Sequence, residues 1–364
     1  MRCAPLCARI AVLRCTNKMP KILMSGNDAI AEGALRAGCS FYAGYPITPQ
    51  NELTAYMANN MQKRGGVFIQ AEAEVAAINM VFGASAAGAR SMTSSSSPGI
   101  SLKQEGISYI AGAELPAVIV NIMRGGPGLG NIAPSQSDYF QATRSGGHGD
   151  YHCIVLAPAS VQEGYDLTCL AFNLADKYRA PAIILGDGML GQMMEPLELK
   201  NQSPKPKAKP WALTGCAGRK ANVVKSFYLK EGDLEKLNLK LQKKYKEITA
   251  KEQRWEELFL DDARVVLVAY GSMARIARAA VKTLRGKGRR VGLVRPISLW
   301  PFPKKAFTRP KNKYLVVEMS YGQMLEDVQL ALCGKAKVEF LGRSGGGVPS
   351  EEEIILKINK IYNG

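Results

Sequence analysis

The sequence predicts an α/β protein with two domains, each built on a parallel β-sheet covered by helices. Short apolar runs alternate with amphipathic stretches from residue 20 to about residue 195, and the same alternation returns after residue 261. The chain has 364 residues, which is long enough for two apolar cores. Between the two regions, residues 201–210 are polar and rich in Pro and Lys, a composition typical of a linker.

Apolar runs and helical periodicity define the expected elements of the first domain. Strands are expected at residues 21–24, 40–43, 66–70, 89–93, 116–123, 152–156 and 181–185. Helices are expected at residues 29–37, 50–61, 74–87, 99–113, 135–143 and 161–178. The alternation ends near Glu195.

A charged run from Asp233 to Leu258 has apolar residues at helical spacing. It is interpreted as a helix that crosses between the domains, and the alternative is a solvated single helix. The second domain then supplies strands at 264–269, 290–294, 313–318 and 337–341, with helices at 273–285, 323–332 and 351–362. The predicted division of the chain has four parts. Residues 1–18 form the leading segment and residues 19–195 the first domain. Residues 196–260 form the linker with the crossing helix, and residues 261–364 the second domain.

Residues 1–18 mix Arg, Cys and apolar residues without the apolar core of a signal peptide. We interpret them as a wrongly assigned start or a disordered extension. The longest apolar runs match a buried strand and fall short of the roughly 20 residues that a membrane helix needs. No membrane association is expected.

Charge and cysteine content restrict the class of protein further. The net charge of +17 is concentrated between Lys200 and Lys251 and in the leading segment, which suits acidic partners. Nucleic-acid binding is not expected, because no aromatic-basic surface motif accompanies the charge. Eight cysteines without a CxxC pair, and only two histidines, predict no metal site in this chain. Buried single thiols indicate a reducing compartment, the cytoplasm.

Four unusual loops follow predicted strands of the first domain, namely Gly44–Pro49, Ala71–Glu74, Thr93–Gly99 and Arg124–Gly130. In an open parallel sheet, ligands bind at the carboxyl ends of the strands. We therefore expect these loops to meet at one edge and to form the site. The serine-rich loop offers hydroxyl and amide groups to a polar ligand, or simply caps a helix.

Three side chains in these loops are candidates for chemistry. Two prolines stiffen the loop around Thr48, whose hydroxyl would point in a fixed direction or cap a helix. Glu74 begins an apolar helix, where burial would raise its pKa and suit proton exchange, although an ordinary first-turn acid is the alternative. Arg124 ends a strand beside a glycine-rich turn and could pair with a carboxylate. The Gly126–Gly130 run lacks the spacing of a dinucleotide loop.

Taken together, these motifs resemble the alpha-type subunit of 2-oxoacid:ferredoxin oxidoreductases. The resemblance rests on Tyr45–Pro49, on the Glu74 helix ending in Gly83–Gly88, on Arg124–Gly128 and on Gly147–Asp150. It extends over residues 20–364, including 295–303 and 345–349. Among subfamilies the chain looks most similar to the branched-chain, 2-oxoisovalerate type, with the 2-oxoglutarate type as a neighbour.

The resemblance implies a pyrimidine-type thiamine diphosphate domain followed by a transketolase C-terminal-like domain. It implies oxidative decarboxylation of a 2-oxoacid with coenzyme A, giving acyl-CoA, carbon dioxide and reduced ferredoxin. A beta-type subunit would hold the diphosphate and Mg²⁺, and a gamma-type and a ferredoxin-like subunit would complete the complex. The iron–sulfur clusters would lie in these partner subunits. Asp187 begins a sequence like the family's metal-diphosphate motif, but no matching Asn follows, so it is interpreted as a turn residue.

Residue roles follow from the same resemblance. Glu74 would bind the aminopyrimidine ring of the cofactor and favour its imino tautomer, with Glu72 as the alternative acid. Pro46 and Thr48 would line the pocket, and Thr48 would bind the substrate carboxylate or keto oxygen. Arg124 would pair with that carboxylate. His148 would touch substrate or coenzyme A, or serve only as a turn residue.

Two other classes of function stay open at this level. The chain could be a scaffold subunit that positions its partners without taking part in the chemistry. It could also be a stand-alone NAD(P)-dependent reductase built on the glycine-rich loop.

Overall fold

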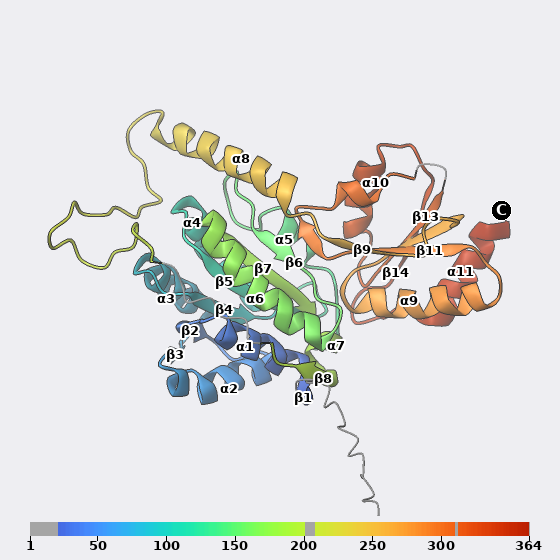
Figure 1. Cartoon of the computed structure of the whole chain (residues 1–364), viewed down its shortest axis with the longest axis horizontal. Coiled ribbons are helices and arrows are strands. Elements are labelled where there is room, and N and C mark those ends of the chain that lie inside the picture. Colours follow the sequence, from blue (N-terminus) through green and yellow to red (C-terminus); the bar gives the residue numbers. More distant parts are fainter. Residues whose placement is uncertain (1–20, 201–207, 310–311, 364) are drawn as a thin grey trace, which may run out of the picture.

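The computed structural model describes residues 21–200, 208–309 and 312–363. Two α/β domains lie side by side, and a long helix runs along the first towards the second (Figure 1). The predicted α/β class and its two parallel-sheet domains are confirmed. The expectation for residues 1–18 lies outside the described residues. Within the described part of the chain, no helix is both long and apolar enough to cross a membrane.

A seven-stranded sheet forms the centre of the first domain, in the order β12-β6-β7-β5-β4-β2-β3. Six of its strands are parallel and come from the first domain, namely β2 (Phe41–Gly44), β3 (Val67–Gln70), β4 (Ser91–Ser95), β5 (Ala117–Met123), β6 (Ile154–Leu156) and β7 (Pro181–Asp187). Their central members are apolar and fully buried, as in sheets covered on both faces.

Helices pack in pairs against this sheet, α1 beside α6 and α3 beside α4. The helices of the domain are α1 (Gly26–Arg36), α2 (Asn51–Asn60), α3 (Glu74–Ala86), α4 (Ser97–Gly112), α5 (Tyr139–Thr143), α6 (Val161–Tyr178) and α7 (Gly188–Gln192), with a 3-10 turn η1 (Gln62–Arg64). Glycines allow the close contacts, since a Cβ at Gly106 of α4 would lie 2.5 Å from a methyl group of Ile78 in α3.

The second domain has a five-stranded sheet in the order β14-β13-β10-β11-β9, in which only β9 is antiparallel. Its strands are β9 (Trp255–Leu258), β10 (Val265–Val268), β11 (Val291–Pro296), β13 (Lys313–Glu318) and β14 (Val338–Gly342). Its helices are α9 (Gly271–Gly286), α10 (Gln323–Leu332) and α11 (Glu351–Asn363), with a 3-10 turn η2 (Lys304–Ala306).

The structure differs from the sequence-based expectations in strand pairing. The predicted first strand, β1 (Lys21–Ser25), lies outside the main sheet and pairs antiparallel with β8 (Met194–Glu198), where no strand was expected. The predicted helix 233–258 is too long, because α8 (Asp233–Lys251) ends before β9. A short strand, β12 (Ser298–Trp300), leaves the second domain and pairs antiparallel with β6 of the first.

Helix α8 is docked and does not stand alone in solvent. Its apolar face buries Leu241, Tyr245 and Ile248. The ring of Tyr245 meets His152 and Trp300 edge-on, with centroid distances of 5.3 and 5.6 Å. The helix therefore packs on the first domain and on Trp300 of β12.

A buried arginine links the two domains. Arg295 of β11 is 2% exposed and donates two 2.7 Å hydrogen bonds to Glu163 of α6. Its Nε also donates to Glu256 of β9 at 2.9 Å. A desolvated guanidinium in a fork with a carboxylate is a strong contact, and losing one partner of such a pair is costly.

We predict that Arg295→Met lowers the free energy of unfolding by about 2–3 kcal/mol, because both carboxylates lose their shared cation. The cost is smaller than for a fully buried pair, since Glu163 and Glu256 are about one third exposed. Chemical denaturation of the two proteins measures the difference. Arg309→Met is the control, because the ion pairs of Arg309 with described residues are long surface pairs at 3.4 Å, and their loss should cost less than about 1 kcal/mol. Equal losses of unfolding free energy for the two variants would contradict the stabilising role of Arg295 between the domains.

Candidate functional site

The four predicted loops meet at one edge of the first sheet. The strands β2, β3, β4 and β5 run parallel, so the loops that follow them leave from the same side. Direct contacts join them, since Ser95 at the end of β4 contacts Glu74 after β3, and Arg124 after β5 binds the Thr48 loop after β2. The four loops therefore lie at one edge of the sheet, as the sequence predicts, and their role as the functional site stays a prediction.

Glu74 is the first residue of α3 and is 6% exposed. The hydroxyl of Ser95 donates to its Oε1 at 3.4 Å. The carboxylate packs against Gly99, where a Cβ would lie only 2.3 Å from Oε1. No described residue donates a hydrogen bond to Oε2. Glu72 differs from Glu74 because it precedes the helix and is exposed.

Lys103 contacts the start of α3 and was missed in the sequence analysis. Its side chain is fully buried, and Nζ donates to the main-chain oxygen of Glu74 at 3.2 Å. A signal was present, because Lys103 occupies the apolar face of α4, one turn after Gly99 and one turn before Ile107. A lysine at such a position is rarely buried without a specific partner.

Arg124 joins two of the loops and is 7% exposed. Its Nη1 donates to the main-chain oxygen of Thr48 and its Nη2 to that of Leu129, both at 3.0 Å. Its Nε is buried without a hydrogen-bond partner. The guanidinium is thus held by loop carbonyl groups and keeps N–H groups that are not used in these two bonds.

A half-buried acidic residue that the sequence did not reveal, Asp138, supports Arg124. Asp138 accepts hydrogen bonds from Ser97 Oγ at 2.6 Å and from Asn121 Nδ2 at 2.9 Å. Ser97 Oγ in turn accepts the main-chain N–H of Arg124 at 3.0 Å. Burial raises the pKa of Asp138, and the hydrogen bonds from Ser97 and Asn121 counteract this. The network fixes the end of β5 against the start of α4.

Several buried polar atoms near these strand ends have no hydrogen-bond partner among the described residues. They are Thr93 Oγ1, Ser96 Oγ, Asn121 Oδ1 and Arg124 Nε. Buried polar groups are normally satisfied, so such a concentration is a feature of a site that binds a polar ligand. The predicted serine-rich loop therefore supplies polar atoms that are free to bind.

The rim of the site is apolar and exposed. Leu129 and Ile132 of the glycine-rich loop are 79% and 64% exposed, and Tyr45 of the Thr48 loop is 39% exposed. Thr48 is half-buried, while Pro46 is exposed. Exposed apolar side chains that cluster around a polar site are typical of a surface covered by another polypeptide.

Asp187 acts as a helix cap, in agreement with its interpretation as a turn residue. Its Oδ1 accepts the main-chain N–H groups of Met189 and Leu190 and the hydroxyl of Ser272 in the second domain. Burial raises its pKa, and these hydrogen bonds counteract the effect. A search of the described residues finds no group of three or more His, Cys, Asp or Glu side chains arranged to hold a metal ion.

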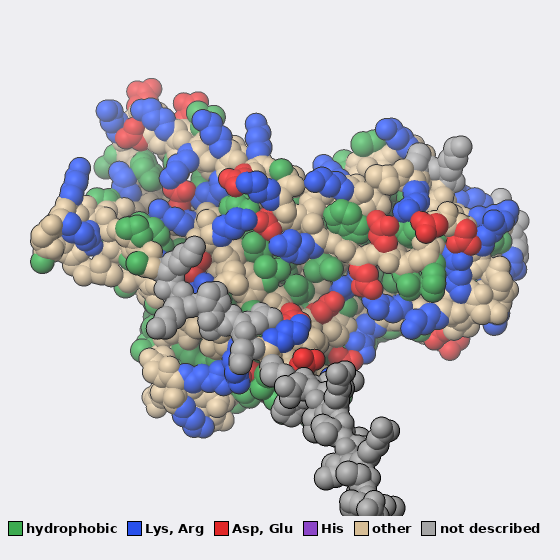
Figure 2. All heavy atoms as spheres, in the orientation of Figure 1, with side chains coloured by type: hydrophobic (Ala, Val, Ile, Leu, Met, Phe, Trp, Pro, Cys, Tyr) green, Lys and Arg blue, Asp and Glu red, His purple; other side chains and the backbone are tan. Residues whose placement is uncertain are grey.

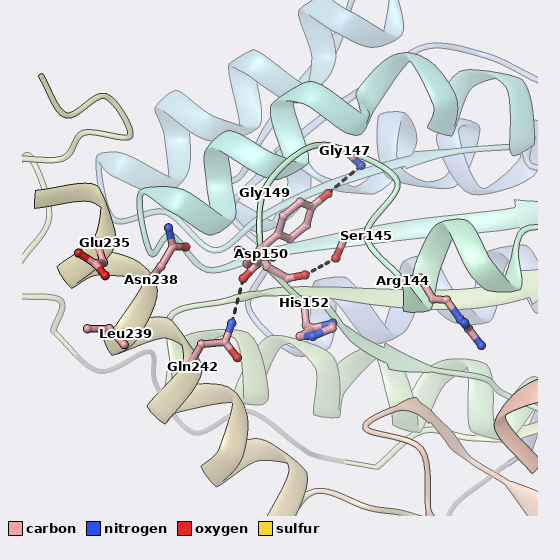
Figure 3. A pocket seen from close by; sticks show the side chains of 11 residues that line it. Arg144, Ser145, Gly147, Gly149, Asp150, His152, Glu235, Asn238, Leu239 and Gln242 are labelled. Atoms are coloured by element: carbon pink, nitrogen blue, oxygen red, sulfur yellow. Dashed lines mark hydrogen bonds between the residues drawn. The ribbon is translucent and has the colours of Figure 1, made fainter. Parts of the chain in front are cut away.

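His148 is not brought to Glu74. Its main-chain oxygen accepts a hydrogen bond from Ser108, and because a helix rises about 1.5 Å per residue, Ser108 lies roughly 14 Å along α4 from Gly99. An open cavity of about 630 Å³ adjoins this region, between α8 and the loop 144–152. Figure 3 shows Gln242 of α8 reaching the main chain of Asp150 there. None of the predicted site residues lines this cavity.

Comparisons with known proteins identify the family of this chain. Residues 32–253 match the family model described as pyruvate flavodoxin/ferredoxin oxidoreductase, thiamine diphosphate-binding. Residues 263–354 match the model of pyruvate:ferredoxin oxidoreductase core domain II. The first match contains all four loops of the site, and the second contains most of the second domain.

Three known proteins illustrate the similarity. The ketoisovalerate oxidoreductase subunit VorB of Methanothermobacter thermautotrophicus is 50% identical, with 93% of this chain and 97% of the relative covered. The 2-oxoglutarate synthase subunit KorA of the same organism is 38% identical, with 93% and 98% covered. The structure of 2-oxoglutarate:ferredoxin oxidoreductase from Magnetococcus marinus matches with a TM-score of 0.83 and 29% identity. That match covers 94% of this chain and 65% of the longer one.

The match to VorB covers 97% of that relative, and the family model covers the edge of the sheet where Glu74, Thr48 and Arg124 lie. The chain therefore belongs to the family of 2-oxoacid:ferredoxin oxidoreductase subunits that carry a thiamine diphosphate-binding domain.

Proposed function

We propose that this chain forms the pyrimidine-binding half of an active site that oxidatively decarboxylates a branched-chain 2-oxoacid with coenzyme A. The products are an acyl-CoA, carbon dioxide and reduced ferredoxin. The observation that carries the proposal is the buried carboxylate of Glu74, whose Oε2 receives no hydrogen bond from the described residues. The higher identity to a ketoisovalerate subunit, 50% against 38% for a 2-oxoglutarate subunit, favours the branched-chain substrate.

The residues present fit the pyrimidine end of thiamine diphosphate. When bound, this cofactor supplies the carbanion chemistry that a 2-oxoacid decarboxylation requires. Glu74 would hold the ring by a hydrogen bond through its free oxygen, and Ser96 and Thr93 offer further polar atoms. A carboxylate that is hydrogen-bonded to a basic ring nitrogen can exchange a proton with it. Of the two acids near the start of α3, burial favours Glu74 over Glu72.

Substrate binding is assigned to the loops that surround this carboxylate. Thr48 presents a half-buried hydroxyl at the mouth, and Pro46 would form part of the pocket wall. Arg124 would bind the substrate carboxylate through N–H groups that the loop carbonyls leave free, Nε among them. Its bond to the Thr48 carbonyl would keep both substrate-binding loops in one position.

The remaining half of the site would come from other polypeptides. The described residues hold no cluster of metal ligands, and the exposed apolar rim at Leu129 and Ile132 suits a covering subunit. A beta-type subunit would supply the diphosphate and Mg²⁺ ligands, and gamma-type and ferredoxin-like subunits would carry electrons and coenzyme A. Free buried thiols at Cys39, Cys153 and Cys169 support a cytoplasmic location.

Lys103 gives the site an unusual charge arrangement. Burial lowers the pKa of its ammonium group from 10.5 to about 8, and the nearby Glu74 counteracts part of this shift. Its ammonium group donates a hydrogen bond to the main-chain oxygen of Glu74 and so holds the first residue of α3 in place. Lys103 thus acts on the cofactor through Glu74 and is a positioning residue.

A second candidate substrate is 2-oxoglutarate, favoured by the 38% identical KorA subunit and the structural match to a 2-oxoglutarate enzyme. Assaying the assembled complex with branched-chain and dicarboxylic 2-oxoacids separates the two. The complex is expected to reduce viologen fastest with the branched-chain substrates. Preference for 2-oxoglutarate would replace the substrate assignment and leave the reaction type unchanged.

We predict that Glu74→Gln lowers viologen reduction by the reconstituted complex at least 100-fold, because the amide cannot exchange a proton with the cofactor. Glu72→Gln is the matched control, two residues away and exposed, and should change the rate less than about twofold. Undiminished decarboxylation by Glu74→Gln would favour a scaffold role for this chain. A larger loss for Glu72→Gln would exchange the two assignments.

We predict that Gly99→Ala weakens thiamine diphosphate binding to the complex about tenfold or more. The added methyl group would overlap the Glu74 carboxylate and the Ser95 hydroxyl, which must then move. Titration of cofactor-free complex with thiamine diphosphate measures the effect. In Gly83→Ala, the methyl group meets open space within α3, so binding should be unchanged and stability equal or up to about 1 kcal/mol higher. Normal binding by Gly99→Ala would contradict the proposed contact.

We predict that Lys103→Met changes the pH dependence of stability. In the unfolded chain the lysine stays protonated to about pH 10.5, whereas the folded chain releases the proton above about pH 8. The folded state therefore binds fewer protons between these values, and the wild-type chain gains stability over Lys103→Met as pH rises, by up to about 3 kcal/mol. Denaturation series at pH 7.5, 9 and 10.5 test this, and parallel curves for the two proteins would contradict it.

A further inference from the structure

The segment 221–229 leaves the first domain before α8 and has the exposure pattern of a strand. Exposed residues alternate with half-buried ones, and the outward residues are Val223, Lys225, Phe227 and Leu229. A period of two is characteristic of an extended chain. The inward residue Val224 packs against the apolar core. The chain bends at Ser226.

Within the described part of the chain, the backbone of this segment has no partner strand. No N–H or C=O group of residues 221–229 takes part in a hydrogen bond with any described residue. Its outward side chains are among the most exposed large apolar residues described, with Val223, Phe227 and Leu229 at 77%, 73% and 85%. A free backbone edge with β-branched and aromatic side chains is a template for an added strand.

The base of the segment is firmly held. The guanidinium of Arg179 lies 4.5 Å over the ring of Trp211, and the main-chain N–H of Leu213 donates to Ala86 at 2.8 Å. Both contacts lie at the amino ends of the strands, on the side of the sheet opposite Glu74. In Figure 1 the chain between residue 208 and α8 projects from this side of the first domain.

The charges around segment 221–229 determine which kind of partner strand can pair with it. Arg219, Lys220, Lys225 and Lys230 flank or interrupt the apolar residues, and Figure 2 shows lysine and arginine side chains beside apolar ones on this projection. Pairing with a second copy that sets Val223 opposite Phe227 would place Lys225 directly opposite Lys225, which is destabilising. Two copies would also bring together chains of net charge +17. An acidic strand removes both costs.

We infer that segment 221–229 binds a strand of an acidic partner polypeptide by β-addition, at a surface separate from the thiamine site. The backbone supplies the hydrogen bonds, the outward apolar side chains fill pockets, and the lysines meet carboxylates. The inference rests on the proposed function only in so far as the partner is a subunit of that complex. Because the surface lies away from Glu74, its role is assembly.

Amide hydrogen exchange of the assembled complex tests the inference. Amides 221–229 should exchange at least tenfold more slowly in the complex than in the full chain purified alone. The double variant Phe227→Asp/Leu229→Asp should lose one polypeptide from the co-purified complex. Leu356→Asp, at a residue 62% exposed on α11, is the matched control and should keep it.

Unchanged exchange, an intact complex with the double variant, or a full chain that dimerises alone through Phe227 would each overturn the inference. The outcome is independent of the reaction. An active complex with an unprotected segment would remove this inference alone. A protected segment in a complex that decarboxylates no 2-oxoacid would remove the proposed function alone.

Discussion

The packing of the Glu74 carboxylate against the bare Cα of Gly99 is the constraint on which the site depends. The carboxyl group occupies space that any other side chain at position 99 would fill. This contact brings the start of α3 against the start of α4, and with them the ends of β3 and β4. Lys103 holds the same helix start, because its Nζ donates to the main-chain oxygen of Glu74. The acid is therefore placed by backbone geometry more than by polar partners.

Much of the fold could be predicted because local periodicity is strong. Helix 161–178 and strand 313–318 begin and end as predicted, and helix 323–332 does as well. The errors concern which strands pair with each other in the sheets. Strand β1 reads as the first strand of the sheet, yet it pairs with β8, more than 160 residues away in the chain. Strand β12 has only three residues, and its partner Leu156 cannot be identified from neighbouring residues.

The same distinction applies to the site, where features set by neighbouring residues could be predicted and contacts between distant segments could not. The location of the loops could be predicted because parallel strands send their carboxyl ends to one edge. The burial that separates Glu74 from Glu72 was only partly predictable, through the apolar residues that follow. Contacts formed between loops could not be predicted, among them the Arg124 bond to the Thr48 carbonyl and the Asp138 network. Each of these contacts forms only when a distant part of the chain folds back onto the loop.

The short strand β12 makes the two domains share a sheet. It belongs to the chain after β11, yet it forms the edge of the first domain beside β6, while Tyr245 of α8 and His152 pack on Trp300. The family-model boundary between residues 253 and 263 therefore does not mark a physical break. A first domain truncated at this boundary would expose the unpaired edge of β6 to solvent, and such an edge promotes aggregation. The two domains therefore depend on each other for a complete sheet edge.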